Sequence, residues 1–178
     1  MDDYINLVKK LSAQDSEEII SNGSTDHAAV LMSEMFRRQK GGKAYIFTGS
    51  LNPLLYCREE VLRSIKEFLE SGGEIDIIVQ NEPEKTSDAS LNGLSDDGLF
   101  AKIKSSGFHD RLSIRRAPSS LESIPYHFAV IGDKSFRFEP EKDKHEAFAS
   151  FNRKEMAQTL VGKFAEFWGE ASAVSPLS

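Results

Sequence analysis

The amino-acid sequence predicts an α/β domain in which helices cover a mixed central β-sheet. The apolar strand of residues 43–48 is followed by a helix and by a second apolar strand at 74–80. This order predicts two parallel strands joined by a right-handed crossover. Residues 126–131 and 135–139 then alternate apolar and polar side chains around a tight Gly-Asp turn. That pattern predicts an antiparallel hairpin, so the sheet should contain both strand directions.

The remaining elements follow from apolar spacing and from residues that cap helices or form turns. Helices are expected at 3–12, 27–39, 53–71 and 96–104, and Asn152 is expected to cap a long helix near the end of the chain. A further strand is expected at 111–115, and a short third run follows the hairpin and ends at Asn152. Residues 81–95 hold little apolar material and are expected to form a mobile loop.

The chain length predicts one domain, because 178 residues are enough for a substantial core. We expect an N-terminal helix and linker at 1–23, the domain at 24–170 and a flexible tail at 171–178. The formal net charge of −6 argues against the broad basic face that duplex DNA normally requires. A local basic patch of Arg111, Arg115 and Arg116 remains an open alternative.

Several classes of protein are disfavoured by what the sequence lacks. It shows neither a signal peptide nor an apolar run of about 18 residues, so we expect a cytoplasmic protein without a membrane span. Its one cysteine, Cys57, allows no intrachain disulfide, which fits a reducing compartment. No pair of Cys or His residues has the spacing of metal ligands, and no Walker or dinucleotide-binding motif occurs. We therefore expect neither a metal nor a cofactor.

The hairpin gathers most of the residues that can do chemistry. His127 begins its first strand, and Arg137 and Glu139 lie two residues apart on the second. Because side chains alternate between the faces of a strand, Arg137 and Glu139 share one face. They either pair at a solvated edge or line a polar cleft. Ser150 and Asn152 add neutral donors where the last strand becomes a helix, and helix N-termini favour anions.

A second group of candidate ligand-binding residues follows the strand at 43–48. Ser50 and Asn52 lie in the loop at its carboxyl end, a position where open α/β sheets commonly bind ligands. Asn52 also suits an ordinary role as a helix cap before Pro53. Both interpretations of this loop stay open.

On these residues the sequence resembles the phospholipase D-like superfamily. The motif of that family is His, any residue, Lys, four residues and Asp, followed downstream by a small residue, Ser, any residue and Asn. His127 and Asp133 match the ends of the first part, and the run Ala-Ser-Phe-Asn at 149–152 matches the second. The family's lysine position is Ala129, and one residue is missing before the Asp. The resemblance covers residues 24–170 and implies a phospholipase D-like half-module.

The resemblance implies that His127 is the nucleophile that takes the phosphoryl group and that Ser150 and Asn152 hold phosphate oxygens. We assign the missing positive charge to Arg137, since guanidinium binds phosphate bidentately. The family builds its catalytic centre from two motifs, so a single-motif chain is expected to form a homodimer.

Three functions remain in competition. The first is a binding or regulatory module with a degenerate site, whose ligand bears phosphate or is a nucleic acid. The second is a metal-independent phosphodiesterase or nuclease that uses His127. The third is a protein-interaction domain that uses the aromatic face of the last helix.

Overall fold

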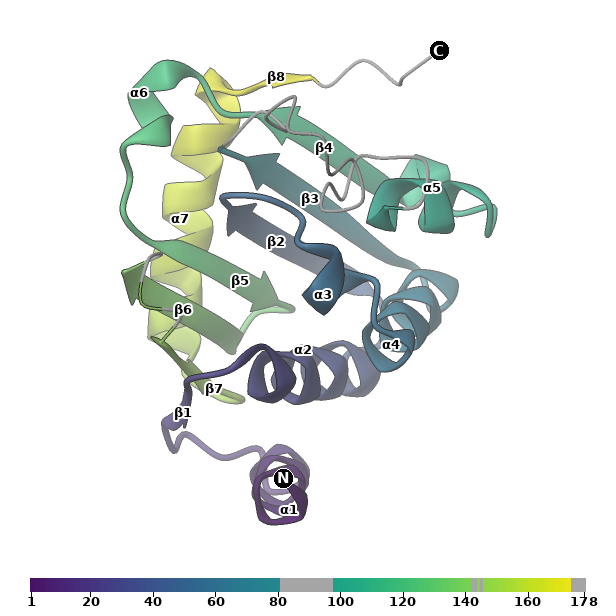
Figure 1. Ribbon diagram of the computed structural model, residues 1–178, viewed down its shortest axis with the longest axis vertical. Helices are drawn as coiled ribbons and strands as arrows, with labels where there is room; N and C mark the ends of the chain where they lie inside the picture. Colours follow the sequence, from purple (N-terminus) through teal and green to yellow (C-terminus); the bar gives the residue numbers. More distant parts are fainter. Residues whose placement is uncertain (81–97, 142–143, 145, 174–178) are drawn as a thin grey trace.

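The computed structural model describes residues 1–80, 98–141, 144 and 146–173. Within these residues one mixed sheet runs in the strand order β1-β7-β6-β5-β2-β3-β4-β8, with helices on both faces (Figure 1). This arrangement confirms the predicted fold class. The strands are β1 (Ile20–Asn22), β2 (Gly42–Thr48), β3 (Gly73–Val79), β4 (Leu112–Arg116), β5 (His127–Ile131), β6 (Ser135–Glu141), β7 (Glu146–Ser150) and β8 (Ser172–Ala173).

The sheet separates two apolar cores, and helices cover each of them. The helices are α1 (Asp2–Ala13), α2 (Thr25–Arg38), α3 (Pro53–Tyr56), α4 (Glu59–Glu70), α5 (Leu99–Lys104), the 3-10 turn η2 (His109–Arg111), α6 (Ser119–Glu122) and α7 (Lys154–Glu170). One core holds the buried faces of α1, α2 and α4, and the other holds the buried face of α7 (Figure 1). Alternation along β2 supplies both cores, because Ile46 packs in the first and Phe47 in the second.

The sheet register brings the end of β2 beside the start of β5. β2 and β3 are parallel, as the strand-helix-strand order predicts, and β2 pairs antiparallel with β5. In that pairing Phe47 lies opposite Phe128. Thr48 follows Phe47 on β2, and His127 precedes Phe128 on β5. These two residues therefore lie at the same end of the two strands.

The helix expected at 53–71 is divided into α3 and α4. Arg58 has an extended conformation (φ −64°, ψ 141°), and its Nε donates to the carbonyl oxygen of Leu54 at 2.8 Å. These features end the first helix before α4 begins at Glu59. Tyr56, the last residue of α3, is buried.

Other differences from the expected elements are local. The polar loop that precedes the hairpin contains the single turn α6, and the loop expected at 81–95 lies outside the described residues. The prediction that Asn152 caps the last helix was wrong. Arg153 occupies the cap position, and the Asn152 side chain donates instead to the carbonyl oxygen of Asp15 at 3.1 Å.

The two ends of the chain contribute strands to the sheet. In the N-terminal segment, Ile20–Asn22 form β1, which pairs with β7, although the sequence indicates a connector there because the strand is short and partly polar. Near the C-terminus, Ser172–Ala173 form β8 beside β4, and the rest of the expected tail, 174–178, lies outside the described residues.

Candidate functional site

A cavity of about 290 Å³ opens at the carboxyl end of β2. Its wall combines the first turn of α2, the loop after β2, α3 and the adjoining parts of β5 and β6. The lining residues are Ser24, Thr25, Ala28, Met32, Phe47, Thr48, Gly49, Ser50, Asn52, Leu55, Tyr56, His127, Phe128, Ala129, Arg137 and Glu139. Five of the seven residues selected from the sequence therefore lie in one wall: His127, Arg137, Glu139, Ser50 and Asn52.

His127, Arg137 and Glu139 form one contact group within this wall. Nδ1 of His127 lies 3.5 Å from Oε2 of Glu139, and Nη1 of Arg137 lies 3.5 Å from the same oxygen. All three side chains are mostly shielded from solvent, with 10–16% of their area exposed. The carboxylate thus lies between a guanidinium and an imidazole.

The pairing of β5 with β6 explains this grouping. His127 is the register partner of Glu139, and Ala129 is the partner of Arg137. Residues at alternate positions point to one face, so these side chains all project toward α2. Phe136 packs in the core on the opposite face. The face assignment made from the sequence is confirmed.

Gln80 is a member of the site that the sequence analysis missed. It directly follows β3, is 0% exposed, and its Oε1 lies 3.0 Å from Nε2 of His127. Its own Nε2 donates to the carbonyl oxygens of Leu121 and Ile124 at 2.8 and 3.0 Å. The available signal was a polar residue directly after the apolar run of residues 77–79.

Asn22 is a second missed member. Its Oδ1 accepts a hydrogen bond from Nε of Arg137 at 3.2 Å, and only 2% of the residue is exposed. Nε is therefore directed toward β1 and Nη1 toward Glu139. These contacts fix the orientation of the guanidinium in the cavity wall.

The first turn of α2 belongs to the same cavity wall as Arg137. Ser24 caps the helix, and its Oγ accepts from the backbone N–H of His27 at 3.1 Å. Ser24 and Thr25 both line the cavity, so the positive end of the 14-residue helix α2 lies at the cavity, where it favours an anion.

Tyr56 and Thr48 form the deeper part of the wall. Burial raises the pKa of Tyr56 to about 12, although the charge of Arg137 acts in the opposite direction. The phenol therefore keeps its proton at neutral pH and serves as a hydrogen-bond donor. Asn52 has the structural role expected for it, because its Oδ1 accepts from the backbone N–H of Leu54 at 2.9 Å. Its place in the wall is compatible with a ligand contact as well.

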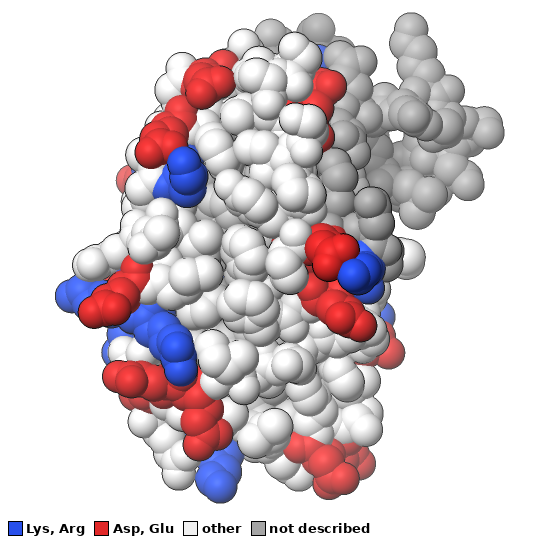
Figure 2. All heavy atoms as spheres, turned by 90° about the vertical axis from the view of Figure 1, so that its left-hand side faces the viewer, with Lys and Arg blue, Asp and Glu red and all other residues white. Residues whose placement is uncertain are grey.

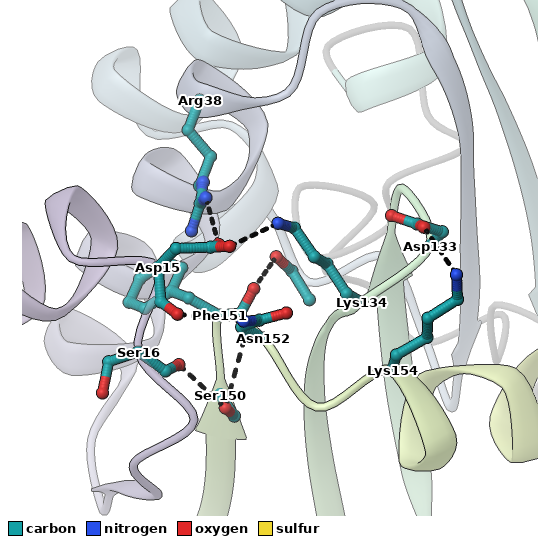
Figure 3. Close-up of polar contacts among 10 residues, drawn as sticks. Asp15, Ser16, Arg38, Asp133, Lys134, Ser150, Phe151, Asn152 and Lys154 are labelled. Carbon is teal, nitrogen blue, oxygen red and sulfur yellow. Dashed lines mark hydrogen bonds and ion pairs between the residues drawn. The ribbon is translucent and has the colours of Figure 1, made fainter.

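Ser150 and Asn152 do not line this cavity; Figure 3 shows them beside Asp15 and Ser16. Ser150 is opposite Phe136 on β6, whereas His127 is opposite Glu139. Three residues along a strand separate the two positions by roughly 10 Å. Ser150 is fully buried, and its Oγ donates to the carbonyl oxygen of Ser16 at 3.4 Å.

Asp133, the last residue of the expected His-to-Asp motif, also lies at that far end. It occupies the turn after β5, where it pairs with Lys154 at 3.7 Å and is 68% exposed (Figure 3). It makes no contribution to the cavity wall. The described residues contain no group of three or more His, Cys, Asp or Glu that could hold a metal ion.

Two of the three arginines of the basic patch considered from the sequence, Arg111 and Arg115, are held by contacts within the protein. Nη1 of Arg111 donates to the carbonyl oxygen of Leu69 at 3.0 Å. Nη1 of Arg115 donates to the carbonyl oxygen of Trp168 at 2.7 Å, and its guanidinium lies over the Trp168 ring. On the face shown in Figure 2, the basic side chains alternate with acidic ones around a wide uncharged area. That face offers no continuous basic surface for duplex DNA.

Comparison with known proteins identifies the fold. Nuc, a phospholipase D family member from Salmonella typhimurium, superposes with a TM-score of 0.55 at 10% identity, over 88% of this chain and 97% of that chain. NucT from Helicobacter pylori gives 0.57 at 10% identity, over 88% and 100%. The fold is phospholipase D-like.

This phospholipase D-like fold extends beyond these two proteins. TrmBL2, an archaeal chromatin protein with a novel mode of DNA binding, has a TM-score of 0.60 at 12% identity, over 95% of this chain and 60% of that chain. Neither a family model nor a curated protein matches the sequence. Among the described residues, no helix has both the length and the apolar character to cross a membrane.

Proposed function

We propose that this phospholipase D-like protein binds a phosphate-bearing ligand in the cavity and acts as a binding or regulatory module with a degenerate active site. The observation that carries the proposal is the setting of Arg137. Its guanidinium lies in the cavity wall, is oriented by Asn22 and Glu139, and lies beside the positive end of α2. A fixed guanidinium and a helix N-terminus are usual means of holding phosphate oxygens.

The proposal includes loss of the family's usual chemistry. The position of the motif lysine is occupied by Ala129, which lines the cavity and supplies no charge. Ser150, Asn152 and Asp133 contact other groups at the far end of the sheet. Removal of one transition-state donor can slow an enzyme by about 10²- to 10³-fold, and several are displaced here.

Nucleic acid is a candidate source of the phosphate. The support is the similarity to TrmBL2, which is described as DNA-binding. The net charge of −6 makes a single strand or a short end a better fit than the long backbone of a duplex, because the cavity supplies one oriented guanidinium rather than a basic face. Cytoplasmic localisation stays a prediction.

The alternative function is a metal-independent phosphodiesterase or nuclease in which His127 attacks phosphorus within a homodimer. It is supported by the place of His127 in the cavity wall and by the similarity to Nuc and NucT. A second copy would bring the second motif that the family's catalytic centre requires. Sedimentation of a monomer at working concentration would count against this function.

The test measures binding and hydrolysis in the same samples. Titration calorimetry with inorganic phosphate and a short single-stranded oligonucleotide should give saturable binding that Arg137→Gln weakens. Hydrolysis of the oligonucleotide in EDTA should be undetectable in the wild type. Hydrolysis that persists in EDTA and is abolished by His127→Ala would support the metal-independent nuclease and refute the binding module. Absence of binding in the wild type would refute the proposal.

A further inference from the structure

Both ring nitrogens of His127 face protein groups rather than the cavity. Nε2 lies 3.0 Å from Oε1 of Gln80, and Nδ1 lies 3.5 Å from Oε2 of Glu139. Only 16% of the His127 side chain is exposed. A nucleophilic histidine must present a nitrogen lone pair to phosphorus, so the position of the ring hydrogens decides what this residue can do.

The amide of Gln80 can adopt only one orientation. Its Nε2 lies 2.8 Å from the carbonyl oxygen of Leu121 and 3.0 Å from that of Ile124. Carbonyl oxygens accept hydrogen bonds, so the amide end that faces them must be the donor. The reverse orientation would place Oε1 against two other oxygens in a site with no exposure to solvent. Oε1 therefore faces His127, and it can only accept.

This orientation determines which nitrogen of His127 carries a hydrogen. Because Oε1 of Gln80 accepts, Nε2 of His127 must donate. In the neutral ring the lone pair is then on Nδ1, 3.5 Å from Oε2 of Glu139. A carboxylate favours a hydrogen on the nitrogen that faces it, so Glu139 opposes this tautomer and Gln80 is the group that maintains it. In the protonated ring no lone pair is left. Neither form directs a lone pair into the cavity.

We propose that Gln80 is a positioning residue that keeps the hydrogen of His127 on Nε2 and so withholds this nitrogen from attack on phosphorus. The inference deepens the proposed function and rests on it for its ligand, since it makes the cavity a site that holds phosphate without forming a covalent phosphohistidine. Attack by Nε2 requires the hydrogen bond between Gln80 and His127 to break.

The same contacts connect His127 to elements on both sides of the site. Gln80 joins it to α6 through Leu121, and Glu139 joins it to Arg137. The backbone of Gln80 is also hydrogen-bonded to β2, since its N–H donates to the carbonyl oxygen of Thr48 at 2.9 Å. The ring is therefore fixed by the sheet itself and not by a flexible loop residue.

The test is long-range ¹H–¹⁵N NMR of the histidine rings at a pH where they are neutral. The chain has four histidines, and the signals that disappear in His127→Gln assign the ring of interest. The wild type should show a hydrogen-bearing Nε2 and a bare Nδ1. In Gln80→Leu the hydrogen should shift toward Nδ1, which faces the Glu139 carboxylate, and the two nitrogen signals should move away from their wild-type positions. A hydrogen on Nδ1 in the wild type, or an unchanged pattern in Gln80→Leu, would overturn the inference.

A matched control is Gln39→Leu, because the amide of Gln39 bonds to Gly41 at 3.1 Å at the other end of the sheet. It should leave the His127 signals unchanged. If Gln80→Leu does not fold, the wild-type spectrum still tests the inference, because a hydrogen on Nε2 supports it and a hydrogen on Nδ1 overturns it. Incubation with bis(4-nitrophenyl) phosphate followed by ³¹P NMR gives a second measurement, in which a phosphohistidine that His127→Gln abolishes would overturn the inference. The ring spectrum is measured without ligand. A failure to bind phosphate would therefore refute the proposed function but not the inference about Gln80 and His127.

Discussion

Asn22 and Arg137 are hydrogen-bonded across the sheet, from Nε of the guanidinium to Oδ1 of the amide at 3.2 Å. Asn22 ends β1, in the N-terminal segment that the sequence places before the domain, and Arg137 lies in the cavity wall. The segment 1–23 thus takes part in orienting the cation on which the proposed function depends.

Replacement of Asn22 by Ala should weaken the binding of inorganic phosphate without contact between the residue and the ligand. Arg137 would lose the acceptor that orients it, and a hydrogen bond to a charged group contributes about 1.5–3 kcal/mol. We expect a loss of affinity of several-fold in calorimetry. Ser21→Ala is the control, since Ser21 lies on the same strand but is exposed. Equal affinities for the two variants would show that Arg137 needs no support from β1.

Replacement of Arg137 by Gln should remove the cationic anchor itself. We expect phosphate affinity to fall by about tenfold or more, and the remaining binding should lose most of its salt dependence. The control is Arg63→Gln on α4, where the arginine pairs with Glu59 and is 63% exposed. If Arg63→Gln lowers the affinity for phosphate and Arg137→Gln does not, the ligand binds outside the cavity.

The relation of His127, Arg137 and Glu139 could be predicted from the sequence because it depends on local rules. A tight turn fixes the register of a hairpin, and alternation then decides which side chains share a face. The parallel pairing of β2 with β3 was predictable for a similar reason, since the crossover has one favoured hand. These rules act between neighbours in the chain.

The contacts of Gln80 and Asn22 could not be predicted in this way. Gln80 is 47 residues from His127, and Asn22 is 115 residues from Arg137, so only the completed sheet brings them together. The converse applies to Ser150, which is close to the hairpin in sequence but is carried by β7 to the end of the sheet remote from His127. Burial of a polar side chain is a tertiary property that a single sequence does not reveal.

Replacement of Gly132 by Ala should destabilise the hairpin that carries the site. Gly132 has a φ of +74°, and a Cβ there would lie 2.5 Å from Oε1 of Gln39. We expect a loss of about 1–2 kcal/mol or more from the backbone conformation alone. Gly162→Ala in α7 is the control, because open space surrounds it and Ala favours a helix by roughly 1 kcal/mol. The single tryptophan, Trp168, can report unfolding in denaturant, and equal shifts for both variants would contradict the prediction.

Replacement of Asp15 by Asn should make the protein less stable at neutral pH but not in acid. The Asp15 carboxylate pairs with Arg38 and Lys134, each at 2.5 Å (Figure 3). The hydrogen bond from Lys134 is the main cause that holds the pKa of Asp15 below its ordinary value of 3.8. Asn keeps the backbone of this residue, whose φ is +51°, because Asn tolerates the left-handed region.

The pH dependence follows from the direction of that shift. A carboxyl group whose pKa is lower in the folded state stabilises the fold above the pKa of the unfolded chain, and this contribution is lost as the pH falls through the folded pKa. Because the side chain of Asp15 is 38% exposed, solvent screening limits the effect to about 1 kcal/mol or less. Unfolding midpoints of wild type and Asp15→Asn should therefore differ at about pH 7 and converge in acid, as the pH falls through the lowered pKa of Asp15. Asp133→Asn should show a smaller difference, since its pair with Lys154 is 3.7 Å long and exposed. A difference for Asp15→Asn that is the same at both pH values would mean that the ion pairs do not fasten the N-terminal segment to the sheet.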